Sequence, residues 1–379
     1  MPWRRTGLSV LGAIAVSVAD GASIAVVKPD AWEGVHYYRD FAYGPRKDIP
    51  GEEGEGCTSG LTGRDDCGRL YNSHRSGQFF DVMVDARGVR PDAPIYLNIH
   101  GGAWCCACDK NGENMWFLRR LAQKGFVVVN MNYQLQTDVL DEKRELVRRE
   151  HATFSDMLAD IDAIVTHLKR DFLPRFGVKA ARFAIGGTSA GAHLSLLYAY
   201  DQGNPSHLGL ALRHDLKVAF AVDVVGPTNL ASEDMMDLFV RANRPLGFLF
   251  SPQMTHRFSH LFGWLTADDL NARMTCGDVE GVKAVLSRYS PAKMVTADCV
   301  PTILAYCRLS KDADTDGCVP VSAYRDLKEA LERAGVPLAA ELRSGLKHGW
   351  LGADYERWLA DRMGEFAQRY LGPCDMTQR

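Results

Sequence analysis

Gly187-Thr188-Ser189-Ala190-Gly191 is the most informative motif of this chain. It follows a strand-like run, residues 182–186, and precedes an apolar run, residues 193–200, that suits a helix. A strand that turns sharply into a helix needs small residues on both sides of the turn to avoid steric clashes. The pattern therefore predicts that the hydroxyl group of Ser189 is exposed at the end of a strand, where it is a candidate nucleophile.

A serine hydroxyl attacks efficiently only when a base removes its proton. For a serine on a strand–turn–helix corner, the expected chain order is serine, then acid, then histidine. The chain has eleven histidines, and only His348 follows the acidic segment near residue 312. His348 lies in a loop between a strand-like run, residues 338–343, and a helix that starts near Asp354. We therefore predict His348 as the base.

The acid lies in the loop of residues 307–320, which follows a run typical of a buried strand. A carboxylate is needed there to hold the histidine in the correct tautomer. Asp316 lies four residues before Pro320, which is expected to open the next helix, so its position relative to that helix is fixed. We predict Asp316 as the acid and keep Asp312 and Asp314 as alternatives.

The stretch His100-Gly101-Gly102-Ala103-Trp104 follows a compact apolar strand, residues 95–99. Glycines directly after a strand allow backbone N–H groups to converge on one point, as an oxyanion hole requires. We expect the amides of Gly102, Ala103 and Ala190 to provide these donors. The histidine that opens the stretch is expected to order the loop rather than to take part in chemistry.

These motifs together resemble the α/β-hydrolases of the esterase/lipase group that carry an H-G-G-x-W oxyanion motif. The chain is similar to secreted or microbial carboxylesterases and to feruloyl-esterase-like members of that group. The resemblance implies a serine hydrolase that forms an acyl-enzyme intermediate and needs no cofactor or metal. It covers roughly residues 78–371, and its matching segments are 100–104, 132–135, 187–191, 289–291, 316–320 and 348–350.

The periodicity of the chain agrees with an α/β fold. Strand-like runs alternate with helical patterns, which predicts a mostly parallel central sheet with helices on both faces. We expect an α/β-hydrolase domain at 78–379, preceded by an N-terminal extension at 20–77. The predicted strands are 79–85, 95–99, 126–131, 182–186, 217–225, 302–306 and 338–343, and the predicted helices include 154–169, 324–334 and 355–370.

Residues 227–288 lie between two predicted strands and form a segment too long for an ordinary connection. The segment is rich in apolar and aromatic residues, including Phe239, Phe250, Phe262 and Trp264. We interpret it as a helical cap insertion over Ser189 that forms an acyl or alcohol pocket. The alternative is a structural excursion that packs elsewhere on the domain.

Composition limits the class of partner. With 379 residues and 46% hydrophobic content, the chain can bury one large core and needs no second domain. A net charge of −3 argues against a nucleic-acid partner. The expected partner is a small-molecule ester, and the sequence does not determine the oligomeric state.

The N-terminus has the pattern of a signal peptide at residues 1–19. Arg4 and Arg5 precede an apolar run, residues 8–18, and small residues follow at the expected cleavage point after Ala19. Asp20 interrupts the apolar run before it reaches a membrane-spanning length, which argues against the alternative of an uncleaved anchor. We expect a protein that is secreted or periplasmic, without a stable membrane span.

Ten cysteines in an exported chain favour disulfide bonds. Cys57 and Cys67 bracket a glycine- and acid-rich loop, and we expect them to pair. A cluster at Cys105, Cys106 and Cys108 is unusual for this position, and we expect one of its members to bridge to another loop, with Cys318 as the candidate partner. The spacing does not match a zinc motif, so no metal is expected there.

The sequence thus predicts a secreted serine hydrolase that cleaves carboxylic esters with Ser189, Asp316 and His348. Two alternatives stay open at this point. The first is amide or peptide hydrolysis of the arylformamidase or acyl-peptidase kind, because the triad does not set leaving-group preference. The second is a non-catalytic binding protein on the same scaffold.

Overall fold

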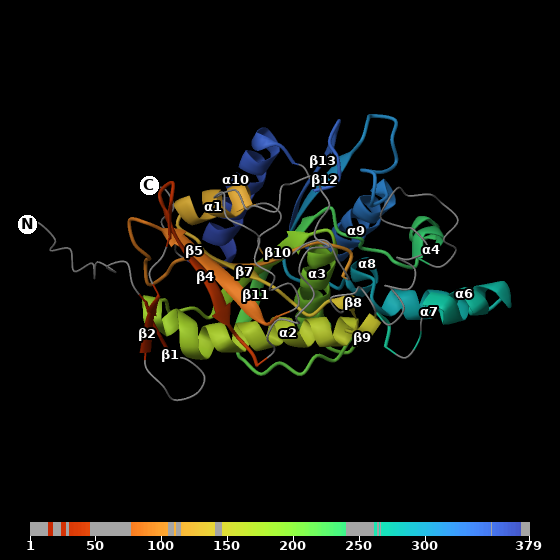
Figure 1. The fold of residues 1–379 in the computed structure, drawn as a ribbon. Coiled ribbons are helices and arrows are strands. Elements are labelled where there is room, and N and C mark those ends of the chain that lie inside the picture. Colours follow the sequence, from red (N-terminus) through yellow and green to blue (C-terminus); the bar gives the residue numbers. More distant parts are fainter. Residues whose placement is uncertain are drawn as a thin grey trace, which may run out of the picture.

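A nine-stranded sheet runs through the described part of the chain, in the order β13-β12-β11-β10-β6-β7-β5-β4-β3 (Figure 1). The computed structural model describes residues 14–17, 24–27, 30–45, 77–104, 110, 115–140, 146–239, 261–263, 265, 267–349 and 351–372. The strands are β3 (Asp30–Trp32), β4 (Val35–Ala42), β5 (Phe79–Asp85), β6 (Ile95–Ile99), β7 (Val127–Met131), β10 (Arg182–Thr188), β11 (Lys217–Val224), β12 (Thr302–Arg308) and β13 (Leu338–Ser344).

The six strands from β13 to β7 are parallel, and β5, β4 and β3 extend the sheet in antiparallel fashion. Every residue of β6 and β7 is buried, which explains why their sequences are mostly apolar without alternation. The exceptions, Asn98 and Asn130, pair with each other at 2.8 Å. The seven predicted strands are confirmed. Strands β3 and β4 were not predicted from the sequence, and they add an edge to the sheet within the expected N-terminal extension.

Helices cover both faces of the sheet (Figure 1). On one face, α1 (Met115–Gln123) contacts α10 (Ala353–Tyr370), and α10 contacts β11 and β12. On the other face, α3 (Ala190–Gly203) contacts β6, β10, β11 and the neighbouring α2 (Phe154–His167). The short α8 (Pro291–Met294) connects α3 to α9 (Val321–Ala334), which contacts β12 and β13. The α/β-hydrolase fold predicted from the sequence is confirmed.

Local sequence explains where these helices begin and end. Thr153 caps α2, because its hydroxyl accepts the Asp156 N–H at 3.2 Å while the Asp156 carboxylate accepts the Thr153 N–H at 2.9 Å. Pro320 lies at the N-terminal cap of α9, as predicted. The same helix ends at Gly335, whose φ of 70° is readily accessible to glycine.

Two further strand pairs lie outside the large sheet. Strands β8 (Gln136–Leu140) and β9 (Leu146–His151) form an antiparallel pair between β7 and α2. Near the N-terminus, β1 (Ile14–Ser17) pairs with β2 (Ile24–Val27). The expected cleavage after Ala19 falls between β1 and β2, and the signal peptide stays a prediction. Among the described residues, none of the helices combines the length and apolarity needed to cross a membrane.

The described parts of residues 227–288 are largely helical, with α4 (Glu233–Phe239), α6 (Ala267–Thr275) and α7 (Val279–Arg288). The segment is attached to the start of α2, where the Phe154 N–H donates to the Leu261 carbonyl at 2.9 Å. The Phe262 ring packs edge-on against Phe154 and Tyr289, with centroid distances of 5.5 and 5.7 Å. Its placement as a cap over Ser189 remains a prediction.

A buried ion-pair network joins the added strands to the rest of the fold. The Lys110 ammonium contacts Asp40 at 2.6 Å and Asp81 at 2.8 Å, and the side chains of Lys110 and Asp81 are fully buried. Asp81 also accepts a hydrogen bond from the Tyr37 hydroxyl at 2.6 Å. Lys110 therefore contacts both strand β4 and strand β5, which are also joined by their backbone pairing.

We expect Lys110→Ala to lower the free energy of unfolding by about 3–5 kcal/mol, because it leaves a buried carboxylate without its cation. Urea denaturation measures this loss. Lys124→Ala is the matched control, since the Lys124–Asp361 pair lies at the surface and its removal should cost less than about 1 kcal/mol. Equal small losses for both variants would show that the buried network contributes little.

Candidate active site

The three predicted catalytic residues all follow carboxyl ends of parallel strands. Ser189 follows β10, Asp316 lies in the loop after β12, and His348 lies in the loop after β13. The register aligns Thr188 with Val224 and Val224 with Ala305, so these loops leave the sheet at one edge. Ligands of open α/β sheets bind at this edge.

Ser189 lies on a strained corner between β10 and α3. Its φ of 55° and ψ of −119° are rare for a residue with a side chain. Backbone hydrogen bonds hold the corner, since the Ser189 N–H donates to the Val224 carbonyl at 2.8 Å and the Ser189 carbonyl accepts from the His193 N–H at 3.0 Å. This is the strand–turn–helix arrangement that the sequence predicts.

The glycines on both sides of Ser189 are required by a close backbone contact. A Cβ atom at Gly187 would lie 2.2 Å from the carbonyl oxygen of Ile99, and one at Gly191 would lie 2.0 Å from the same oxygen. Ile99 is the last residue of β6. The serine corner therefore packs directly against the strand that leads into the His100–Trp104 stretch.

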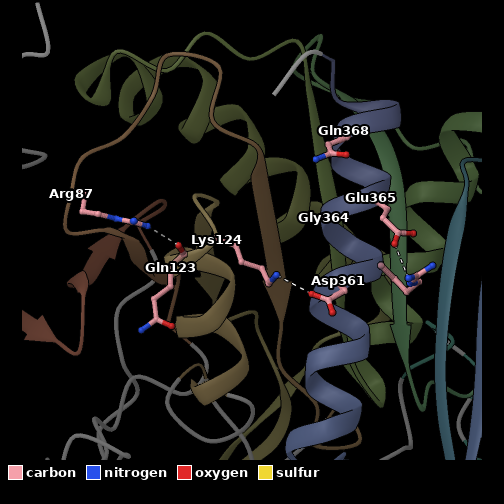
Figure 2. A pocket seen from close by; sticks show the side chains of 8 residues that line it. Arg87, Gln123, Lys124, Asp361, Gly364, Glu365 and Gln368 are labelled. Carbon is pink, nitrogen blue, oxygen red and sulfur yellow. Dashed lines mark hydrogen bonds and ion pairs between the residues drawn. The ribbon is translucent and has the colours of Figure 1, made fainter. Parts of the chain in front are cut away.

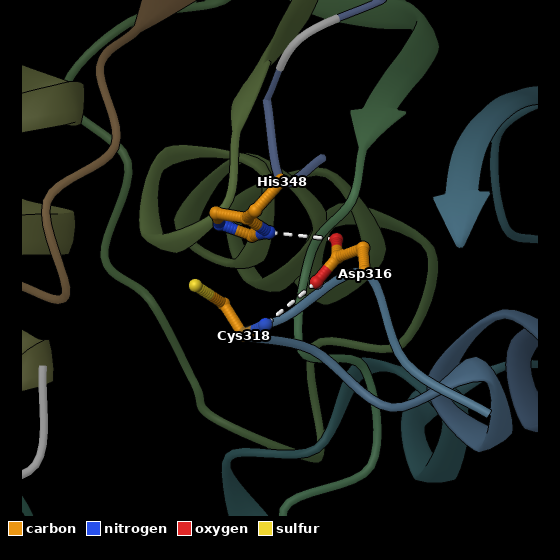
Figure 3. Close-up of side chains that lie close together, drawn as sticks. All are labelled: Asp316, Cys318 and His348. Carbon is orange, nitrogen blue, oxygen red and sulfur yellow. Dashed lines mark hydrogen bonds and ion pairs between the residues drawn. The ribbon is translucent and has the colours of Figure 1, made fainter. Parts of the chain in front are cut away.

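Asp316 and His348 form a hydrogen-bonded pair (Figure 3). The distance from His348 Nδ1 to Asp316 Oδ2 is 2.7 Å, and the His348 N–H donates to the Asp316 carbonyl at 3.1 Å. The other carboxylate oxygen, Oδ1, accepts the N–H groups of Cys318 and Val319 at 2.8 and 2.7 Å. Asp316 is buried, whereas Asp312 and Asp314 are exposed. Of the three aspartates, the structure pairs Asp316 with the histidine.

This pairing determines the chemistry that the imidazole can perform. The short contact with a carboxylate places the ring proton of His348 on Nδ1, so Nε2 carries the lone pair. A histidine in this tautomer can accept a proton on Nε2, and the buried carboxylate stabilises the resulting imidazolium.

The His100–Trp104 stretch forms a tight loop after β6. Gly102, Ala103 and Trp104 have φ values of 104°, 53° and 60°, an uncommon run of three positive values. The N–H groups of Gly102 and Ala103 donate to no other described residue. Ala190 is the first residue of α3, where an N–H has no partner within the helix. These are the three amides predicted as oxyanion donors.

Trp104 anchors this loop to the helix that follows the serine. Its buried ring packs edge-on against His193 and Phe154, with centroid distances of 5.1 and 5.4 Å. His193 Nε2 in turn lies 2.8 Å from the Tyr289 carbonyl. Burial lowers the pKa of His193 to about 4, so this ring is neutral and structural. Sequence reasoning did not assign this role to His193, although its position four residues after Ser189 fixes it on α3.

The histidine that opens the stretch also has an ordering role, as expected. The His100 ring stacks on the Tyr133 ring with a centroid distance of 4.5 Å and an interplanar angle of 19°. Its Nδ1 lies 2.7 Å from the Gly101 carbonyl. Tyr133 belongs to the 132–135 segment, which is one of the segments that match the family pattern. Its contact with His100 gives this segment a structural role beside the loop after β6.

Asp223 is a buried carboxyl group that the sequence analysis missed. It lies near the end of β11, where Oδ2 accepts the Tyr306 hydroxyl at 2.8 Å and Oδ1 accepts the Gly226 N–H at 2.8 Å. Burial raises the pKa of Asp223 from 3.8 to about 7, although both hydrogen bonds oppose the shift. No motif marks this residue, because a carboxyl inside a strand is identified only by its neighbours.

The described cysteines do not test the predicted disulfides. Cys57 and Cys67, and the cluster at residues 105–108, lie outside the described residues, so both predicted bridges stay predictions. Cys276, Cys299 and Cys307 are free thiols. The Cys307 thiol lies 3.3 Å from the Lys347 carbonyl and 4.0 Å from Asp316 Oδ2, and burial, followed by the Asp316 charge, raises its pKa to about 12.

A polar surface pocket of about 430 Å³ lies between the end of α1 and α10 (Figure 2). Its lining includes Arg87, Gln123 and Lys124, and Lys124 forms an ion pair with Asp361 at 2.9 Å. Gln123 and Lys124 lie just before the first residue of β7. The pocket is thus at the amino edge of the parallel strands, opposite the edge with Ser189, and it is not the candidate active site.

Comparison with known families agrees with this geometry. The BD-FAE family model, which describes feruloyl-esterase-like α/β-hydrolases, matches residues 80–331, about two thirds of the chain. The chain belongs to the BD-FAE family. The resemblance to feruloyl-esterase-like α/β-hydrolases that the sequence analysis identified is confirmed. The prediction that the chain is an esterase-type hydrolase is confirmed at the level of the family. A search of curated proteins returns no significant match.

Several solved structures with similar folds are esterases. An inhibited esterase B from Lactobacillus rhamnosis is 16% identical, with a TM-score of 0.56 and 90% of each chain covered. A truncated carbohydrate esterase from gut microbiota is 14% identical, with a TM-score of 0.59, over 90% of this chain and all of that chain. An esterase from Pyrobaculum calidifontis is 18% identical, with a TM-score of 0.50, over 76% of this chain and 79% of that chain. At these identities the likeness establishes the fold.

The raised pKa of Asp223 gives a testable dependence of stability on pH. Between about pH 4 and pH 7 the folded protein keeps a proton that the unfolded chain has lost, so this group's contribution to stability is largest below pH 4 and decreases up to pH 7. Asp223→Asn cannot ionise. Its stability relative to wild type should therefore rise by up to about 4 kcal/mol between pH 4 and pH 8.

Urea denaturation of both proteins across this pH range measures the difference. Asp312→Asn, at an exposed position, is the matched control for the loss of one carboxylate. A stability difference between Asp223→Asn and wild type that does not change with pH would contradict the raised pKa.

Proposed function

We propose that the protein hydrolyses carboxylic esters through an acyl-enzyme intermediate, with Ser189 as nucleophile, His348 as general base and Asp316 as the acid that orients it. The observation that carries the proposal is the 2.7 Å hydrogen bond between His348 and the buried Asp316, at the same sheet edge as the strained Ser189 corner. The mechanism requires a nucleophile, a base and a carboxylate that orients the base. The order serine, acid, histidine along the chain is the one expected for a serine on a strand–turn–helix corner.

In the first half-reaction, the Ser189 oxygen attacks the ester carbonyl carbon while His348 Nε2 takes the hydroxyl proton. The carbon–oxygen bond to the alcohol then breaks, and His348 returns the proton to the departing alcohol. In the second half-reaction, His348 takes a proton from a water molecule that attacks the acyl-serine. The acid product leaves, and Ser189 regains its proton.

Each tetrahedral intermediate carries a negative oxygen that needs hydrogen-bond donors. We assign this role to the N–H groups of Gly102, Ala103 and Ala190. The contact between the serine corner and Ile99 supports the assignment, because it fixes the loop after β6 beside the start of α3. The anchoring of Trp104 on His193 supports it as well. Donors that are fixed before the reaction lose no energy to reorganisation.

The proposed substrate is a small-molecule ester. One similar structure is described as a carbohydrate esterase and another as an acetyl ester-xyloside hydrolase, which supports esters borne on sugars as a substrate class to test. Amide or peptide hydrolysis uses the same triad. Comparison of kcat/KM for p-nitrophenyl acetate, acetylated xylosides and peptide anilides separates these possibilities, and a preference for the anilides would replace the ester proposal.

A fluorophosphonate probe should label the wild-type protein covalently, because it traps an activated serine. Ser189→Ala should abolish labelling and ester hydrolysis, while Ser195→Ala should retain both, since Ser195 is a buried serine on the same helix whose hydroxyl bonds to the Gly191 carbonyl. Gel fluorescence and mass spectrometry of the labelled peptide measure the outcome. No labelling of the folded wild type would refute the enzyme mechanism.

Asp316→Asn should lower kcat by about 10³- to 10⁴-fold, because the amide no longer holds His348 in the productive tautomer. Asp314→Asn, two residues away in the same loop and exposed, should keep kcat within about twofold, as expected for a surface change away from the site. Steady-state hydrolysis of p-nitrophenyl acetate measures both. A large loss in Asp314→Asn with an active Asp316→Asn would reassign the acid.

We also propose that the protein is exported. The support is the sequence of residues 1–19, with its basic start, apolar run and small residues before Asp20. N-terminal sequencing of protein recovered from the culture medium and the periplasm should give Asp20 as the first residue. Retention of the protein in the cell with Met1 in place would contradict export.

A further inference from the structure

A third metal-binding side chain lies beside the Asp316–His348 pair. One ligand atom from each of Asp316, Cys318 and His348 lies within 4.8 Å of the other two (Figure 3). Carboxylate, thiolate and imidazole are the three side-chain ligand types that zinc uses in proteins. Neither the proposed ester hydrolysis nor the family match assigns a function to the Cys318 side chain.

The spacing is close to that of a zinc site. With zinc–ligand bonds of about 2.0–2.3 Å, neighbouring ligand atoms in a tetrahedral site lie roughly 3.3–3.8 Å apart. Ligand atoms that already lie within 4.8 Å of one another therefore need shifts of only about 1 Å, which rotation of a cysteine side chain supplies. Cys318 and His348 are partly exposed, so an ion from solvent can reach both. A water molecule would complete the tetrahedron.

The carboxylate is held in an orientation that suits a ligand. Asp316 Oδ1 accepts two backbone N–H groups, from Cys318 and Val319, which leaves Oδ2 on the side of His348. Fixed supporting contacts of this kind raise metal affinity, because less order has to be created on binding. The turn that contains Cys318 is defined by Gly317, whose φ of 103° suits glycine.

We propose that Asp316, Cys318 and His348 bind a zinc ion and that this ion reversibly inhibits ester hydrolysis. The inhibition rests on the proposed function, because His348 is the base of that mechanism. A metal on Nδ1 replaces the proton that bonds to Asp316, and a metal on Nε2 occupies the lone pair that accepts the serine proton. The site uses Cys318 as a thiolate, so it and the predicted bridge from Cys318 to the 105–108 cluster exclude each other. Binding releases the thiol proton and, for Nδ1, the ring proton to solvent.

The inhibition test measures hydrolysis of p-nitrophenyl acetate during titration with zinc chloride, in the presence of a non-thiol, non-chelating reductant. The rate of each variant is expressed relative to its own rate in EDTA. Zinc should inhibit the wild type, and EDTA should restore the rate. Cys318→Ser should need at least about tenfold more zinc for half-inhibition, since removal of even a supporting residue costs 10- to 100-fold in affinity.

Cys276→Ser is the matched control, because Cys276 is an exposed thiol directly after α6 and belongs to no part of the proposed site. It should titrate like the wild type. Identical zinc titrations of the wild type and Cys318→Ser would overturn the proposed site. Inhibition that EDTA does not reverse would overturn it as well.

A second measurement detects the site without catalysis. Cobalt(II) bound through Cys318 should give a near-ultraviolet thiolate-to-metal charge-transfer band in the Ser189→Ala variant, and Ser189→Ala/Cys318→Ser should lack that band. If the wild type hydrolyses no ester but the band appears in Ser189→Ala and is lost in Ser189→Ala/Cys318→Ser, the metal site stands and the proposed function is refuted. Ester hydrolysis without any Cys318-dependent band would refute the metal site alone.

Discussion

The structure around the site depends on the contact between two backbones at the end of β6. The Ile99 carbonyl lies so close to Gly187 and Gly191 that neither position has room for a Cβ atom. This contact sets the distance between β6 and the β10–α3 corner. It also brings the end of β6, where the positive-φ loop begins, next to the first N–H groups of α3. A shift of either backbone would move Ser189 and the proposed oxyanion donors relative to each other.

Much of this arrangement could be predicted from the sequence because its determinants are local. The buried parallel strands have continuous apolar runs, the serine corner has its two glycines, and Pro320 marks the start of α9. The chain order of serine, acid and histidine then left only His348 as the base. These features depend on residues that are neighbours in the chain or that follow a fixed order, so the sequence displays them directly.

Other parts could not be predicted because they depend on contacts between distant segments. The choice among three aspartates needed the exposure of each side chain and the position of His348, 32 residues further along the chain. The Asp223 environment needed Tyr306 from another strand, and the placement of Cys318 needed the loop after β13. Strand β4 was missed because its alternation of buried and exposed positions is broken by adjacent buried tyrosines, Tyr37 and Tyr38.

The Lys110 network has a consequence for the boundaries of the functional unit. The family match begins at residue 80, but Asp40 and Tyr37, which complete the network, lie on β4 before that boundary. At the other end, the match stops at residue 331, before His348. A recombinant fragment cut at the limits of the family match would therefore lose part of a buried charge cluster and the proposed base together. We therefore expect a fragment that folds like the full chain to extend at least from β4 through α10, because the helix after His348 contacts β11 and β12.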